Sequence, residues 1–198
     1  MSSNTTQSRN TYLEQIKRMR EASINDENPL AAAFKKLGID ARVNNECGAR
    51  ENRRDGDVII TREFPGANGQ TLGSYQGIES QVSRRYEHFS YTAAKIGAFT
   101  GAWVYLACLE RGQKDNMDMY IVSEAGDEPE EIELGMIHVI LSREELEGVL
   151  KKRPSGVYPS RDKEYFTINP PALSNCQTAV FSDTLDGVVA LLVKSKHW

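Results

Sequence analysis

Residues 102–109 read AWVYLACL, a continuous apolar run of strand length. Such a run is typical of a central strand that is covered on both faces of its sheet. Two further segments, at residues 116–123 and 134–142, predict strands on either side of the acidic loop at residues 124–133. The chain is therefore expected to contain a largely buried sheet.

Upstream of this run, two segments predict an antiparallel pair of strands. The first strand is expected at Val58–Phe64 and the second at about Ser74–Val82. The connecting residues 65–73 read PGANGQTLG, in which Pro-Gly and Asn-Gly supply the preset and positive φ values that tight turns need. Two strands joined by such a connection are expected to pair as a hairpin.

Helical periodicity predicts four helices around the sheet: from Thr11 onward, over residues 28–38, over residues 85–99 and over residues 142–152. In the last of these, Ser142 and Glu145 have the spacing of a capping box. A short strand is expected at Glu164–Ile168, whereas residues 187–195 fit either a strand or a helix. The predicted fold class is α/β (α+β), with a mixed central β-sheet flanked by helices.

Composition limits the organisation and the kind of partner. The 198 residues, 39% of them hydrophobic, predict one domain over residues 11–198 after a polar, disordered tail at residues 1–10. The formal charge of −4 means that nucleic-acid binding would need a local basic patch. Three dispersed cysteines exclude a zinc ribbon and a disulfide scaffold. With neither a signal peptide nor a membrane-length apolar run, a soluble cytoplasmic protein without membrane contact is expected.

Polar residues interrupt the predicted hairpin strands at three positions. Asp57 directly precedes the apolar Val58, and Glu79 and Gln81 share one face of the second strand because alternate residues point the same way. Pairing of the strands would bring the two carboxylates together, and a hard cation such as Mg²⁺ or Mn²⁺ would relieve their repulsion and neutralise a phosphate under attack. Gln81 could orient the attacking water by hydrogen bonding. In the alternative interpretation, Asp57 closes a turn, and Glu79 and Gln81 line the solvent-exposed face of the sheet.

The order of elements over residues 28–110 resembles the PD-(D/E)xK nuclease superfamily, to which many type II restriction endonucleases belong. The strand carrying GDVII stands where that family has its PD, and the strand carrying IESQ where it has ExK. The resemblance implies a restriction-endonuclease-like core in which Asp57 and Glu79 bind the metal ion. Gln81 then occupies the lysine position, as glutamine does in some restriction endonucleases of the superfamily. Glu46 matches an additional upstream acid found in part of the family.

Basic residues gather around the same strands and predict a DNA-binding surface: Arg53, Arg54, Arg62, Arg84 and Arg85. Arginine suits this role because its guanidinium binds phosphate in a bidentate fork. The alternative is a solvated loop whose acidic neighbours offset the charge. Lys95, in the predicted helix at residues 85–99, is expected at the surface, although it could swing toward the two acids.

Other chemistries find little support in the sequence. His88, His138 and His197 show no metal-ligand spacing, and neither a GxSxG, a Walker A nor a GxGxxG motif occurs. We therefore expect a Mg²⁺-dependent endonuclease that hydrolyses DNA phosphodiester bonds, and a homodimer if it cuts both strands. The alternative is a noncatalytic nucleic-acid- or protein-binding accessory protein, of viral or phage type, on the same core.

Overall fold

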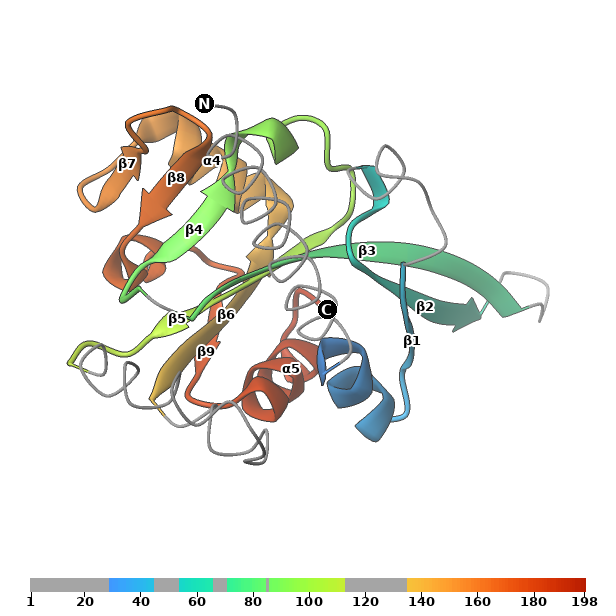
Figure 1. Ribbon diagram of the computed structural model, residues 1–198. Helices are drawn as coiled ribbons and strands as arrows, with labels where there is room; N and C mark the ends of the chain where they lie inside the picture. The colour runs from blue at the N-terminus through green and yellow to red at the C-terminus, as the bar shows by residue number, and fades with distance from the viewer. Residues whose placement is uncertain (1–28, 45–53, 66–70, 85, 113–134) are drawn as a thin grey trace, which may run out of the picture.

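The computed structural model describes residues 29–44, 54–65, 71–84, 86–112 and 135–198. Its strands form a six-stranded sheet with the order β1-β2-β3-β5-β6-β9 and a three-stranded sheet with the order β4-β8-β7 (Figure 1). The helix at residues 29–36 precedes β1. The other elements are β1 (Asp40–Val43), β2 (Val58–Pro65), β3 (Thr71–Ser83), β4 (Phe89–Thr92), the 3₁₀ helix η1 (Ala93–Lys95), β5 (Trp103–Leu109), β6 (Met136–Ser142), α4 (Arg143–Lys152), β7 (Val157–Pro159), β8 (Tyr165–Ile168), the 3₁₀ helix η4 (Pro170–Leu173), β9 (Val180–Ser182) and α5 (Leu185–Lys194).

The predicted fold class is confirmed, and the apolar run at residues 102–109 is a central strand. All seven residues of β5 are buried. Trp103 and Tyr105 belong to one hydrophobic cluster, whereas Val104 and Leu106 belong to the other, on the opposite face. Burial on both faces explains why this strand is apolar throughout, whereas a half-solvated strand would alternate.

Different elements cover the two faces of the large sheet (Figure 1). The helix at residues 29–36 and α5 cover one face, packing Phe34 and Val188 among other apolar side chains into its cluster. On the other face lie α4 and the small sheet, whose Phe89, Tyr91 and Leu146 belong to the second cluster. The small sheet lies on the same side as α4. Its strand β4 lies next to the last part of β3, to which it is joined by hydrogen bonds between Thr92 and Gln81.

The long strand β3 changes partner along its length. Its first part pairs antiparallel with β2, from Thr71 to Ile78, and its last part pairs parallel with β5, from Ile78 to Ser83. β1 pairs with residues 58–61 of β2 beside the core, and the far part of the β2–β3 pair projects from the body as an arm (Figure 1). The expected antiparallel pairing of the two predicted strands is thus confirmed.

The helix predicted over residues 85–99 is wrong. The described residues 86–99 contain β4 and η1 instead, and β4 pairs antiparallel with β8, where Phe89 lies opposite Ile168. Phe89 and Tyr91 are buried, whereas Ser90 and Thr92 are half-buried, which is the two-residue period of a strand. Aromatic and β-branched residues favour such a strand once a partner from elsewhere in the chain is available.

Several local predictions are confirmed, and one open choice is decided. Ser142 caps α4 by accepting a hydrogen bond from the Glu145 amide at 3.3 Å. The Glu145 carboxylate turns to the amides of Gln177 and Thr178. The strand expected at Glu164–Ile168 is β8, and residues 187–195 lie mostly in the helix α5. The helix predicted from Thr11, the tail at residues 1–10 and the strand predicted at residues 116–123 lie outside the described residues.

Among the residues that the structure describes, none of the helices has the length and apolar character needed to cross a membrane.

Candidate active site

Asp57 and Glu79 meet at the point where the arm joins the body of the protein. Asp57 directly precedes β2, and its amide donates to the carbonyl of Ile78 at 2.8 Å. Its carboxylate accepts a hydrogen bond from the amide of Ser80, also at 2.8 Å. Ser80 directly follows Glu79 on β3. The two carboxyl groups share a hydrogen bond. The predicted convergence of the two acids is therefore present in the fold.

Both acids are buried, so water does little to stabilise their charges. Asp57 is 8% exposed and Glu79 only 1%. Burial, and then the neighbouring charge of Asp57, raise the pKa of Glu79 to about 8. Burial also raises the pKa of Asp57, against the opposing effects of the Lys95 charge and the Ser80 amide. The interpretation that places Glu79 on a solvent-exposed face of the sheet is therefore wrong.

Lys95 supplies the positive charge of the site. Its Nζ lies 2.7 Å from Oε2 of Glu79, and its side chain is 14% exposed. The expectation of a surface position for Lys95 is wrong because residues 93–95 form η1 at the end of β4, not the middle of a long helix. This short 3₁₀ turn brings the lysine over the face of β3 that carries Glu79. The alternative in which Lys95 turns toward the two acids therefore applies.

Gln81 is held in place by β4. Its Nε2 donates to Oγ1 of Thr92 at 2.8 Å, and its Oε1 accepts from the amide of Thr92 at 3.2 Å. Gln81 shares the face of Glu79, as the two-residue spacing requires. Its carboxamide ties β4 to β3, and it thereby fixes the start of η1 and the position of Lys95.

A second charged pair lies near the acids and involves α4. Arg143 donates to Glu147 at 3.1 Å, four residues further along α4. Both groups act electrostatically on the buried Tyr91, as do Asp57 and Glu79. Burial chiefly, and then the charges of Glu79 and Glu147, raise the pKa of Tyr91. Tyr91 therefore stays a neutral phenol beside the acids. The predicted helix over residues 85–99 gave no indication of this position.

Backbone contacts that only glycine allows fix the spacing of the two acids. An added Cβ on Gly77 would lie 1.8 Å from the carbonyl oxygen of Asp55, and one on Gly56 would lie 2.6 Å from that of Ile78. Gly56 also has a φ of +89°, a conformation that glycine adopts readily. The segment that delivers Asp57 therefore crosses β3 backbone against backbone.

The predicted DNA-binding arginines do not form one cluster in the described residues. Arg54 binds its neighbour Asp55 through two hydrogen bonds, at 2.7 and 2.8 Å. The guanidinium of Arg62 lies over the ring of Trp198, 4.7 Å from its centroid. Arg84 is half-buried at the end of β3. Arg53, Arg85 and the upstream acid Glu46 lie outside the described residues.

The histidines take structural positions where the structure places them clearly. His138 is buried in β6, with its Nδ1 2.9 Å from the hydroxyl of Tyr105, and burial lowers its pKa to about 4. His88 stacks on Tyr86. Neither belongs to the group formed by Asp57, Glu79 and Lys95.

The described part of the chain thus presents a class of site: two buried carboxylates and a lysine on one face of an α/β sheet. Among the described residues, no group of three or more histidine, cysteine, aspartate or glutamate side chains could hold a metal ion. Comparison with models of known protein families, with curated proteins and with solved structures finds no match for this chain.

Proposed function

We propose that the protein is a divalent-metal-dependent endonuclease whose catalytic centre consists of Asp57, Glu79 and Lys95. The observation that carries the proposal is the shared hydrogen bond between two buried carboxyl groups, with the Lys95 ammonium 2.7 Å from one of them. Burying three ionisable groups together costs free energy of folding because water no longer stabilises their charges. Groups with strongly shifted pKa values of this kind cluster at functional sites.

The two acids fit a small hard cation. Mg²⁺ binds in proteins through one or two carboxylates, together with water and substrate phosphate, so a third acidic ligand is not required. Burial raises the pKa values of both Asp57 and Glu79, and the Asp57 charge adds to the rise for Glu79, even with Lys95 nearby. An ion between the carboxylates would take the place of the proton they share. When bound, the ion would neutralise charge on the phosphate and lower the pKa of a bound water.

In this proposal Lys95 serves as the catalytic lysine, although the family resemblance places the lysine position at Gln81. The amide group of Gln81 is engaged by Thr92, whereas the Lys95 ammonium reaches Glu79 directly. A fixed ammonium beside the carboxylates can orient the attacking water and stabilise the negative charge that develops on the phosphate. The chain therefore combines an ExQ motif on β3 with a lysine supplied by η1.

Cleavage of nucleic acid tests the proposal. Wild type should cut plasmid or oligonucleotide DNA in Mg²⁺ or Mn²⁺, and Glu79→Gln, Asp57→Asn or Lys95→Ala should lower the rate by roughly 100-fold or more. Glu164→Gln and Lys152→Ala are matched controls, because both side chains are exposed, and should leave the rate unchanged.

Thermal melting separates a catalytic centre from a structural ion cluster. Added Mg²⁺ or Mn²⁺ should raise the Tm of wild type but not that of Asp57→Asn, because a ligand that binds only the folded state stabilises it. A wild type that cuts no DNA or RNA, and whose Tm ignores divalent metal, would exclude the enzyme and leave the noncatalytic binding module. That alternative is favoured by one observation, the nearly complete burial of Glu79.

A further inference from the structure

A concave surface lies beside the two acids on the same face of the arm. Its volume is about 360 Å³, and its lining residues are Arg42 on β1, Ile59 on β2, Tyr75 and Gly77 on β3, together with Asn44, Asp55, Thr100 and Gly101. In the strand register, Arg42 lies opposite Ile59, and Ile59 lies opposite Gly77. Since alternate residues share a face, Ile59 and Gly77 lie on the same face of the sheet as Asp57 and Glu79, and the backbone of Asp55 lies over Gly77 between the concave surface and the acids.

Tyr75 is the most exposed of the large hydrophobic side chains in the described residues. Its exposed fraction is 72%, and it stands four residues before Glu79, roughly 13 Å along the strand. An aromatic ring displayed on a polar surface can stack on a nucleic-acid base, whatever the base is. Inside a double helix each base pair is stacked between its neighbours, so a base in the interior of a strand that stacks on Tyr75 must be unpaired.

The charges of the concave surface suit a phosphate. Asp55 is engaged by Arg54, so its negative charge is largely offset. Arg42 is exposed at the opposite wall, and none of the ion pairs found among the described residues involves it. Arg42 and Tyr75 together thus offer a guanidinium for a phosphate and a ring for a base, the two elements that single-strand-binding surfaces combine.

We infer that this concave surface, formed by Arg42, Ile59, Tyr75 and Gly77, is a subsite for one unpaired nucleotide next to the phosphodiester bond that is cut. The inference rests on the proposed function and names its substrate class: single-stranded DNA, or duplex DNA with an unpaired nucleotide at a flap, gap or branch. The interior of a fully paired duplex lacks the free base face that Tyr75 needs.

Binding of labelled oligonucleotides, followed by fluorescence anisotropy of the full chain in chelator, tests the subsite without cleavage. Single-stranded and gapped DNA should bind more tightly than a blunt duplex of the same length. Tyr75→Ala should weaken single-strand binding by roughly 5- to 100-fold, the range measured for loss of one base stack, and Tyr75→Phe should retain it. Arg42→Ala should reduce the slope of log Kd against log salt concentration by about one phosphate contact.

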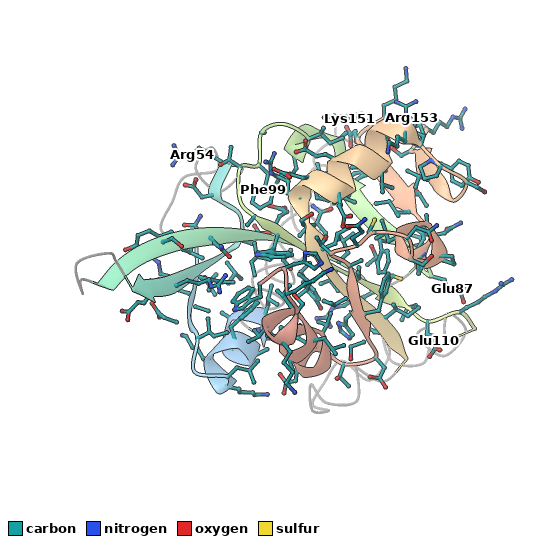
Figure 2. All side chains as sticks on the ribbon, turned by 180° about the vertical axis from the view of Figure 1, so that it is seen from behind. Arg54, Glu87, Phe99, Glu110, Lys151 and Arg153 are labelled. Carbon is teal, nitrogen blue, oxygen red and sulfur yellow. The ribbon has the colours of Figure 1, made fainter. Side chains whose placement is uncertain are left out.

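Matched controls come from the far end of the sheet. Tyr86 is 53% exposed and Arg111 is exposed nearby, since the Leu109 amide donates to the Tyr86 carbonyl. Figure 2 shows Glu87 and Glu110, the acidic neighbours of this pair, at the opposite end of the molecule from Arg54, which marks the root of the arm. Tyr86→Ala and Arg111→Ala should change single-strand binding less than twofold.

The outcomes separate the subsite from the proposed function. Equal binding of single strands and duplex, no binding at all, or a Tyr75→Ala variant that binds like wild type would overturn the subsite. If duplex DNA is nevertheless cut in an Asp57- and Glu79-dependent way, the endonuclease remains and only its substrate class changes. Tyr75-dependent binding of single strands, without cleavage of any DNA or RNA, would uphold the subsite and remove the enzyme.

Discussion

Replacing Glu79 with glutamine should stabilise the metal-free protein, and the gain should grow as the pH rises. The side chain is 1% exposed, and its pKa is raised from 4.5 to about 8 in the folded protein. Below pH 4.5 both the folded and the unfolded chain carry the proton, and a protonated glutamate resembles glutamine in shape and charge. The substitution should therefore have little effect at low pH.

Between pH 4.5 and about 8, the unfolded chain releases a proton that the folded chain keeps. The stability of wild type then falls relative to Glu79→Gln by up to about 1.4 kcal/mol for each pH unit. The difference should reach about 3 kcal/mol at pH 7, and it should become constant above about pH 8, where Glu79 is ionised in both states. Few substitutions of a buried acid stabilise a protein while removing its activity, so the combination is diagnostic.

Urea unfolding, followed by tryptophan fluorescence at pH 5 to 9 in chelator, measures this difference. The comparison is made between the two proteins at each pH, so the contributions of groups remote from position 79 cancel, whereas that of Asp57, which interacts with Glu79, is part of the measured difference. Glu164→Gln, an exposed carboxylate, serves as the control and should show no trend. Parallel curves for wild type and Glu79→Gln, or a wild type that gains stability relative to the variant as the pH rises, would refute the reasoning.

Three further substitutions test the packing around the site. Val104→Asp buries a charge at a fully buried position of β5 and should cost more than about 4 kcal/mol or abolish cooperative melting. Gly77→Ala places a Cβ against the Asp55 carbonyl and should destabilise by several kcal/mol, roughly 2 to 4, whereas the control Gly148→Ala, with nothing within 4 Å, should be neutral or stabilising in urea titrations. Gln81→Lys removes two hydrogen bonds to Thr92 and should lower stability by about 1–2 kcal/mol without raising the cleavage rate.

The sequence predicted those parts of the fold that depend on neighbouring residues. The apolar run that became β5, the antiparallel pairing of β2 with β3, and the cap of α4 each follow from residues close in sequence: an unbroken apolar segment, two neighbouring segments of strand pattern, and one hydroxyl. The convergence of Asp57 and Glu79 followed from the predicted pairing of β2 with β3 and from the two-residue period of a strand, which together set the face on which each side chain lies.

The parts that failed depend on residues distant in sequence. Phe89 satisfies a helical stripe with Ala93 as well as a strand alternation with Tyr91, so the local pattern is ambiguous. Pairing with β8, more than seventy residues away, selects the strand. Because a helix was predicted over residues 85–99, the predicted position of Lys95 was also wrong. Its ion pair with Glu79 depends on the 3₁₀ turn η1, which the local pattern did not predict.

The change of partner along β3 divides the candidate site between two structural units. Asp57 directly precedes β2, which pairs with the first part of β3, whereas Glu79 lies in the part of β3 that pairs with β5. Ile78 alone is paired on both sides, opposite Val58 and Trp103. Separation of β2 from β3 would therefore carry Asp57 away and leave Glu79 in place. If Mg²⁺ binds to both acids, it should hold β2 against β3, and the amides of residues 71–77 should then exchange their hydrogens more slowly in Mg²⁺ than in chelator.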